Sequence, residues 1–495
     1  MPYYERLSAL DASFLGIEDE NMHMHVGGVL IFDAAPLRTP EGGIDINRIR
    51  LAIAARLHLV PRFRQKLAFV PYEGSPVWVD DDRFRLAYHV RHTALPLPGD
   101  DRQLKRLTGR IMSQGLDRKR PLWEMWVVEG LDGDRFALIS KTHHCMIDGI
   151  SGADLMSVIL SPFPEDDPGM PEPWVPRPRP TGVHLFADAV ARRAEQPREA
   201  VRAIYQTLSD PHRLQEVTEK ATGMLEALAP ALSPASPTPI NVEVGPHRRF
   251  DWTEMRVPDL KVVKNILGGT LNDVVLTTVA GALRRFFQKR GVDVDSLDVR
   301  AMCPVSVRSQ DERGALGNRV TQMTVPLPVH IADPVKRMNI VRESTKDVKE
   351  SKQALGGEVL TAISDWTVPN VLVQAVRLAA RTRPYTLIVT NVPGPQLPLY
   401  MCGALMRASY PVVPLFDHVG LVIGLFSYNG GLYWGLNADW EHVPDLHDMI
   451  LALESSFSEL QFAAAEIEAL PPEKRRPAGR GGHRKPRSEA SAAAQ

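Results

Sequence analysis

The stretch His143-His144-Cys145-Met146-Ile147-Asp148-Gly149 is the most informative part of this chain. It follows Phe136 to Lys141, a short and mostly apolar run that predicts a strand. The next residues, Ser151-Gly152-Ala153-Asp154, have the spacing of a capping box and predict the start of a helix. Two imidazoles, a carboxylate and a glycine are therefore expected in one short turn between a strand and a helix.

A histidine at such a junction is a natural general base, because its unperturbed pKa lies near cellular pH. Asp148 is not automatically its partner. A carboxylate four residues after His144 could orient the imidazole, or it could face away and brace the loop against an arginine elsewhere. The residues alone leave both roles open.

The stretch also resembles a known motif. HHCMIDG matches the HHxxxDG motif of the coenzyme A-dependent acyltransferases, which include chloramphenicol acetyltransferase, carnitine acyltransferases and peptide-synthetase condensation domains. Further matches run in order from about residue 4 to about residue 465 and make the chain similar to the bacterial wax ester synthase/diacylglycerol acyltransferase family, of the triacylglycerol synthase type. These matches are Leu7 to Leu15, Pro61 to Leu67, Pro121-Leu122-Trp123-Glu124, Asn272-Asp273, Pro304 to Arg308 and Asn391 to Pro395.

The resemblance implies a fold and a reaction. The fold would be α/β, with two chloramphenicol-acetyltransferase-like lobes, mixed sheets, flanking helices and an active-site channel between the lobes. The reaction would move a long-chain acyl group from acyl-coenzyme A to diacylglycerol, to a long-chain fatty alcohol or to both. Acyl-coenzyme A would be a co-substrate, and no bound cofactor is expected.

The resemblance also assigns roles around the histidines. His144 matches the catalytic base, and His143 would support the loop, because adjacent residues in a turn seldom point at the same atom. Asp148 would form an ion pair with Arg308 and orient the loop. Gly149 would permit close backbone approach or a positive φ.

Other residues are expected to position substrate. Asn272 opens a predicted helix whose N-terminus suits a developing oxyanion, whereas Asp273 fits a capping box as well as a functional role. Thr390 and Asn391 could donate to the acyl carbonyl or the pantetheine, although a strand that ends in a proline-glycine turn explains them equally well. Pro121, Leu122 and Trp123 resemble a channel-entrance motif, but an indole at a strand start is more often part of the core.

Bulk properties limit the class of protein. With 495 residues, the chain is expected to form two or three domains. A net charge of −1 gives no argument for a nucleic-acid partner. No run approaches the roughly 18 apolar residues of a membrane span, and the N-terminus lacks a signal pattern. Three cysteines, Cys145, Cys303 and Cys402, suggest reduced thiols in a cytoplasmic protein.

Changes in composition and proline-rich breaks predict four segments. They are an N-terminal lobe at 1–160, a proline-rich linker and helical connector at 161–240, a C-terminal lobe at 241–470, and a basic, disordered tail at 471–495. Strands are expected at Val26 to Phe32, Val299 to Val305, Tyr385 to Asn391 and Gly420 to Tyr428. Helices are expected from Ile46 to Leu59 and from a capping box at Thr270 to Gly291.

Competing chemistries are weaker. A metal site formed by His143, His144, Cys145 and Asp148 lacks a zinc spacing. The pair His23 and His25 would share one face of a strand, which fits packing as well as a ligand. Cys145 follows the proposed base too closely to serve it as a nucleophile, and Ser151 lacks the G-x-S-x-G elbow.

Two other functions remain open. The chain could be a condensation-type acyltransferase that uses a carrier-protein-bound donor, or a non-catalytic lipid-binding protein. The segment 182–208 and the tail from Lys474 to Arg487 could also contact a membrane or lipid droplet peripherally, although a connector helix and a solvated tail explain them better.

Overall fold

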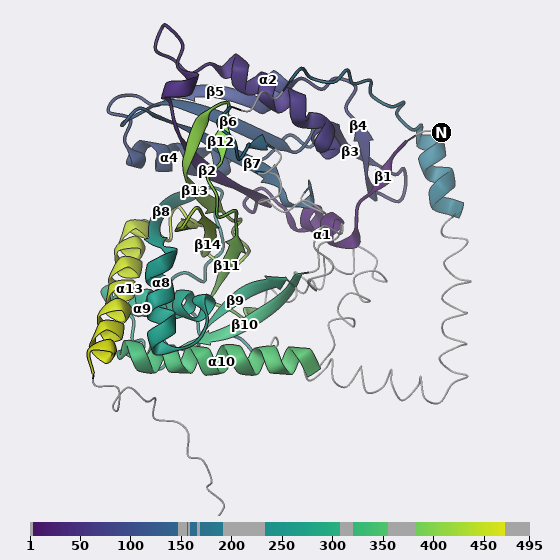
Figure 1. Cartoon of the computed structure of the whole chain (residues 1–495). Coiled ribbons are helices and arrows are strands. Elements are labelled where there is room, and N and C mark those ends of the chain that lie inside the picture. Colours follow the sequence, from purple (N-terminus) through teal and green to yellow (C-terminus); the bar gives the residue numbers. More distant parts are fainter. Residues whose placement is uncertain are drawn as a thin grey trace, which may run out of the picture.

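The computed structural model of the chain describes residues 3–146, 156, 159–165, 169–191, 233–306, 320–354 and 382–470. Asp148, Gly149, Arg308, Ser151 to Asp154 and the basic tail lie outside the described residues. Within them, the chain forms two α/β lobes, with the N-terminal lobe above the C-terminal lobe in Figure 1. Each lobe contains a mixed sheet with flanking helices, so the predicted fold class is confirmed.

The central sheet of the N-terminal lobe holds the histidine strand in its interior. In the described part of the chain, its strand order is β12-β13-β2-β7-β6-β5, where β12 is Tyr400–Met401 and β13 is Ala404–Val412. β7 (Arg135–His143) pairs antiparallel with β2 (His25–Asp33) and with β6 (Trp123–Leu131), and β6 pairs parallel with β5 (Val90–Ala94). The strands predicted from residues 26 and 136 are thereby confirmed. An interior strand has a paired backbone on both sides, so its last residue, His143, is held firmly in place.

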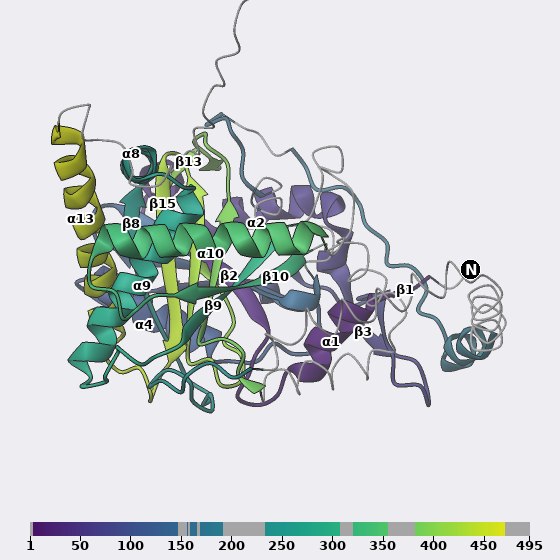
Figure 2. The same ribbon diagram turned by 90° about the horizontal axis from the view of Figure 1, so that it is seen from below.

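Helices and a small sheet surround this central sheet (Figures 1 and 2). The small sheet has the order β1-β4-β3 in the described residues. The predicted helix at residue 46 is confirmed, but its α-helical part ends at Arg56 and its last three residues form a 3₁₀ turn. The elements are β1 (Glu5–Arg6), α1 (Ala9–Ile17), η1 (Ala35–Leu37), α2 (Ile46–Arg56), η2 (Leu57–Leu59), η3 (Pro61–Arg64), β3 (Gln65–Phe69), β4 (Pro76–Asp80), α3 (Leu86–His89), α4 (Asp101–Met112) and η4 (His144–Met146).

The C-terminal lobe has a second mixed sheet. Its order in the described residues is β10-β9-β11-β14-β15-β8. The strands predicted near residues 299, 385 and 420 are present, although β11 begins two residues later than predicted. The elements are β8 (Arg248–Arg256), α8 (Val257–Leu267), α9 (Leu271–Lys289), β9 (Val299–Ser306), β10 (Val320–Leu327), α10 (Pro334–Ala354), β11 (Leu387–Pro393), β14 (Leu421–Tyr428), β15 (Gly431–Asp439) and α13 (Leu446–Ala469).

α9 is the core helix of this lobe, as its apolar spacing predicted. Thr270 caps its N-terminus in a reciprocal capping box with Asp273. Its side chains are buried along most of its length, where it packs against α8, α10 and α13. Figure 2 shows α10 lying across this lobe.

A crossover joins the lobes. β12 (Tyr400–Met401) and β13 (Ala404–Val412) belong to the C-terminal half of the sequence, but β13 pairs with β2 in the N-terminal sheet. β13 also packs against β14 and β15 of the C-terminal lobe. The approach is so close that a Cβ atom on Gly435 would lie 1.9 Å from the carbonyl oxygen of Pro411, which leaves room only for glycine.

The linker has little regular structure of its own. Residues 169–181 form no helix or strand, and a helix follows at Gly182–Ala191. Arg177 fastens the linker to β4 through an Nη2–Oδ1 ion pair of 2.8 Å with Asp80. The rest of the expected connector lies outside the described residues.

No single helix in the described ranges is long and apolar enough to cross a bilayer. Among the described residues, one pair of helices, α8 and α9, is long and apolar enough when taken together, and the two are bent by 94° at their junction. The apolar residues of both helices form part of the core of the C-terminal lobe.

Candidate active site

The two motif histidines lie at the end of β7, where the backbone is fastened on both sides. The N–H of His143 donates to the carbonyl of Leu122 at 2.9 Å, and the N–H of His144 donates to the carbonyl of Met24 at 2.7 Å. His143 ends the strand and His144 opens the 3₁₀ turn η4. The backbone therefore sends the two imidazoles in different directions.

His144 packs against the first matched motif. Its ring lies 4.0 Å from the ring of Phe14 in α1, centroid to centroid, with an interplanar angle of 34°. Part of the residue stays accessible, but its Nδ1 atom is buried and has no hydrogen-bond partner among the described residues. Burial, reinforced by the neighbouring His143, lowers the pKa of His144 to about 4. The imidazole is therefore neutral at physiological pH.

Both ring nitrogens of His143 face a polar group, although only Nδ1 makes a hydrogen bond among the described residues. Its Nδ1 accepts the N–H of Cys145 at 3.1 Å, so the ring proton belongs on Nε2. Nε2 faces Oε2 of Glu18 at 3.4 Å. Of the two adjacent imidazoles, His144 is the one whose Nδ1 has no protein partner in the described structure.

The carboxylate of Glu18 contacts several charged and polar side chains next to the histidine motif. Its carboxylate lies 3.6 Å from His25 Nε2 and 2.6 Å from Arg118 Nη2, in addition to its contact with His143. Burial opposes ionisation of Glu18, but His143 and Arg118 outweigh it and lower its pKa to about 2. The site therefore contains a carboxylate that is ionised at physiological pH and lies next to His143.

The sequence analysis did not identify Glu18. Its only local signal is a carboxylate at the C-cap of α1, immediately after the matched Leu7 to Leu15. His23 and His25 stack at 5.2 Å beside it, but only His25 belongs to a strand, because β2 begins there and not at the predicted His23. Burial lowers the pKa of His25 well below its ordinary value, so this imidazole is neutral. No cluster in the described residues has the arrangement that a metal ion needs.

The Pro121-Leu122-Trp123 motif supports the histidines through the backbone and the core. Leu122 supplies the carbonyl that accepts from His143. Trp123 is fully buried, stacks on Phe63 at 4.5 Å and donates its Nε1–H to the Phe63 carbonyl at 2.9 Å. Phe63 belongs to the matched Pro61 to Leu67, so two motifs distant in sequence meet under the site.

Asp273 and Asn272 differ in their surroundings. The Asp273 carboxylate accepts from the Thr270 N–H at 2.7 Å and from the Thr345 hydroxyl at 2.7 Å, and it is buried. It serves as the capping-box residue and links α9 to α10. Asn272 is half-buried, and no hydrogen bond of its side chain is found among the described residues.

Thr390 and Asn391 lie where two strands diverge. β11 pairs with β14 along this stretch, but it pairs with β9 only at Leu387 and Ile388. Beyond Ile388, the β9 side of β11 is therefore outside the described sheet pairing, and Thr390 and Asn391 are both half-buried. This edge has groups available for a ligand.

Two of the cysteines, Cys145 and Cys303, are poor nucleophiles. No disulfide joins Cys145, Cys303 and Cys402. Burial raises the pKa of Cys145 well above its ordinary value and that of Cys303 to about 12. A thiol rather than a thiolate is present at both positions.

Comparison with known proteins identifies relatives of the whole chain. Residues 7–275 match the wax ester synthase/diacylglycerol acyltransferase catalytic domain, and residues 316–461 match the C-terminal domain of the same family. A putative diacylglycerol O-acyltransferase of Mycobacterium tuberculosis is 35% identical over 471 residues, covering 92% of this chain and 90% of that protein. A second, probable diacylglycerol O-acyltransferase from this organism is 32% identical over 464 residues, with 92% and 95% covered.

Solved structures show the same architecture. The wax ester synthase/diacylglycerol acyltransferase from Marinobacter aquaeolei is 27% identical, with a TM-score of 0.68 over 93% of this chain and all of that chain. The first condensation domain of the calcium-dependent antibiotic synthetase has a TM-score of 0.55 at 18% identity, with 94% and 97% covered. The second likeness concerns the fold alone.

Proposed function

Because this chain belongs to the wax ester synthase/diacylglycerol acyltransferase family and is therefore an acyltransferase, we propose that it moves a long-chain acyl group from acyl-coenzyme A to diacylglycerol, a long-chain fatty alcohol or both. The observation that carries this proposal is the neutral, partly accessible imidazole of His144 at the end of an interior strand. Acyl-coenzyme A is a co-substrate, and the chemistry needs no other group.

His144 acts as the general base. It accepts the proton of the acceptor hydroxyl while the hydroxyl oxygen attacks the thioester carbonyl carbon. The tetrahedral intermediate then collapses, the carbon–sulfur bond breaks, and the imidazolium returns its proton to the departing thiolate. Such help contributes about 100- to 10,000-fold in rate.

The lowered pKa of His144 sets the protonation state of the resting ring, although it also makes the neutral imidazole a weaker base. An imidazole with a pKa of about 4 is almost entirely neutral at pH 7, which is the form that a base requires. Its conjugate acid is strong, which favours proton return to the thiolate. The position against Phe14 shields the proton transfer from water on that side.

Other residues hold substrate and loop in place. Asn272, Thr390 and Asn391 donate to the acyl carbonyl or the pantetheine, since these half-buried side chains come from a helix start and a diverging strand. The contact between His143 and Glu18 holds the histidine loop in position. The roles that the family motif assigns to Asp148, Arg308 and Gly149 belong to the same proposal, and these three residues lie outside the described part of the chain.

The direct experiment supplies a long-chain acyl-coenzyme A with diacylglycerol or hexadecanol and follows ester and free thiol. Folded His144→Ala is expected to lose about 100-fold or more in kcat, whereas His58→Ala, at an exposed helix end, should keep its rate. Full activity of His144→Ala would remove the base assignment. Lipid binding without thiol release would indicate a binding protein, and turnover only with a carrier-bound donor would indicate a condensation-type enzyme.

Peripheral lipid contact belongs to the same proposal, with the protein in the cytoplasm and touching the inner membrane or a lipid droplet. On the helix Gly182–Ala191, Leu185 and Ala189 pack on the small sheet, while Val183 and Val190 stay exposed. Flotation with vesicles tests this contact: Val183→Ser together with Val190→Ser should reduce the bound fraction.

A further inference from the structure

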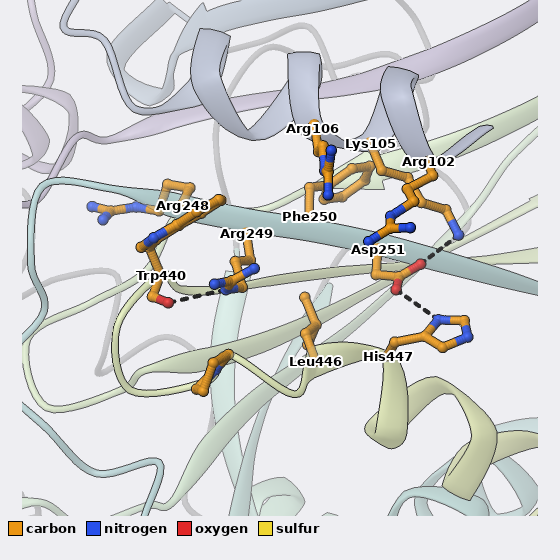
Figure 3. Close-up of a pocket in the computed structure, with 11 residues that line it drawn as sticks. Arg102, Lys105, Arg106, Arg248, Arg249, Phe250, Asp251, Trp440, Leu446 and His447 are labelled. Carbon is orange, nitrogen blue, oxygen red and sulfur yellow. Dashed lines mark hydrogen bonds and ion pairs between the residues drawn. The ribbon is translucent and has the colours of Figure 1, made fainter. Parts of the chain in front are cut away.

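A cavity of about 440 Å³ lies between the lobes on the side of α4. It is bounded by α4 of the N-terminal lobe and by β8 and the start of α13 of the C-terminal lobe (Figure 3). Its volume falls in the range of small-molecule sites. Its lining includes none of the residues to which the proposed reaction assigns a role.

The cations on α4 share one face of the helix. Arg102, Lys105 and Arg106 are spaced three and four residues apart, and Figure 3 shows all three projecting toward β8. The opposite face is apolar, with Leu104 and Ile111 buried in the N-terminal core. Packing of that apolar face therefore fixes the cationic face over the cavity.

Positive charge in the cavity exceeds the negative charge. Five lining residues are arginine or lysine, and the lining contains one carboxylate, Asp251. Asp251 is already shared by Lys105, at 2.5 Å, and His447, at 3.1 Å. Arg102 and Arg106 have no ion pair within the described structure.

The contacts and the lowered pKa of Arg249 are consistent with this excess of positive charge. It stacks over the Trp440 ring at 3.8 Å and donates to the Trp440 carbonyl at 3.0 Å, so it contacts no carboxylate there. Burial lowers its pKa, and repulsion from Arg106 lowers it further. Uncompensated cations in a concave site favour a multiply charged anion.

Arg248 connects the cavity to the histidine loop. Its backbone N–H donates to Ser113 Oγ at 2.9 Å, just after α4, and its guanidinium donates to the carbonyl of Asn21. Asn21 lies in the segment between Glu18 and His23, which are both at the site. Arg248 therefore links the cavity to the segment that carries Glu18 and His23.

We infer that this cavity binds the phosphate-bearing nucleotide end of the acyl-coenzyme A co-substrate. The inference rests on the proposed function. Arg102 and Arg106 pair with the phosphates, while the apolar surfaces of Phe250 and Leu446 contact the nucleoside. A hollow between two lobes suits a compact nucleotide better than a flat lipid surface.

Direct binding tests the inference without turnover. Adenosine 3′,5′-bisphosphate, which is the nucleotide end without pantetheine, is titrated into the whole protein by calorimetry. Arg102→Gln with Arg106→Gln is expected to weaken binding about ten- to hundredfold. Arg110→Gln changes an exposed arginine of α4 outside the cavity and should leave the affinity within about twofold. Equal binding by the double variant and the wild type would overturn the inference.

Kinetics with two donors gives a second test. The double variant should raise the KM for acyl-coenzyme A by about ten- to hundredfold, with little change in kcat, because in this inference the two arginines contact the nucleotide and not the reacting atoms. The KM for an acyl-pantetheine donor, which lacks the nucleotide, should stay unchanged. An equal loss with both donors would overturn the assignment.

The two proposals fail in different ways. If the wild type transfers no acyl group from any donor, the proposed function is wrong, and bisphosphate binding still decides what the cavity holds. If the double variant loses binding to phosphatidylglycerol vesicles but keeps bisphosphate binding, the ligand is a lipid headgroup and the inference is overturned.

Discussion

The Nε2 atom of His143 lies 3.4 Å from the Oε2 atom of Glu18, which joins the first helix of the chain to the end of the histidine strand. The carboxylate also contacts His25 and Arg118, so this one side chain links the end of α1 to three other segments of the chain. Because Nδ1 of His143 accepts from the Cys145 backbone, the ring is held from both sides. The geometry of η4, and with it that of His144, depends on this contact.

Replacing Glu18 with glutamine should therefore affect stability and activity together. Glu18→Gln removes the charge that faces His143 and Arg118, and we expect a loss of about 1–3 kcal/mol in the free energy of unfolding with a reduced kcat. Urea unfolding and initial rates measure both effects. Glu20→Gln, at an exposed position two residues away, is the matched control. A Glu18→Gln variant as active and stable as Glu20→Gln would contradict the bracing role.

The pH dependence of catalysis should reflect the lowered pKa of His144. A base with a pKa of about 4 stays neutral as pH falls through 6.5, so kcat/KM should show no titration there. The acid limb should appear only near pH 4. Rates are measured after brief exposure to each pH, and recovery on return to pH 7 separates titration from unfolding. A limb centred near 6.5 would contradict the burial of this ring.

Acid stability should depend on His89, whose ring lies between Phe84 and Trp123. Burial lowers its pKa to about 4, whereas in the unfolded chain the pKa is near 6.5. The folded pKa is depressed, so this contribution is fully present above pH 6.5 and is lost as pH falls toward 4. The loss is worth about 3 kcal/mol.

His89→Gln cannot titrate and should lose less stability than the wild type between pH 6.5 and 4. Urea unfolding at several pH values measures the difference, and His58→Gln at an exposed position should follow the wild type. Parallel curves for His89→Gln and the wild type would show that the buried ring is not neutral.

The crossover of β13 should not tolerate a side chain at residue 435. In Gly435→Ala, the added Cβ would lie 1.9 Å from the Pro411 carbonyl oxygen, which is backbone and cannot turn away. We expect a loss of about 1–3 kcal/mol or more. Gly115→Ala is the control, since a Cβ there meets only ordinary contact at 3.5 Å. Equal melting temperatures for the two variants would mean that the lobes cross with more space than the structure shows.

Tyr428 should stabilise the same crossover through its hydroxyl. The group accepts from the Leu399 N–H at 2.9 Å and donates to the Met406 carbonyl at 3.0 Å, and the side chain is fully buried. Tyr428→Phe leaves both backbone groups unsatisfied and should cost about 1–3 kcal/mol. Tyr72→Phe, at a side chain that is 98% exposed, should cost nothing measurable. A neutral Tyr428→Phe would show that water replaces the hydroxyl.

Local sequence patterns predicted most of the elements. The apolar runs before His143 and after Thr270 became β7 and α9, because strand alternation and helical spacing reflect burial within one element. The ordered motifs also identified the family and the two-lobe fold. Asp273 could not be decided from the sequence, because a capping carboxylate and a functional one have the same spacing; the structure shows its oxygens bound to Thr270 and Thr345.

The sequence by itself determined the strand that ends in two histidines, the capped core helix and the family. Only the tertiary structure decided that Glu18 stands behind His143, that β13 leaves its own half to join the N-terminal sheet, and that Arg102 and Arg106 face β8. The physical reason is the separation in sequence between the residues that interact. Hydrophobic periodicity and capping act within a few residues, whereas these contacts join groups far apart in the chain, and packing of whole sheets and helices brings them together.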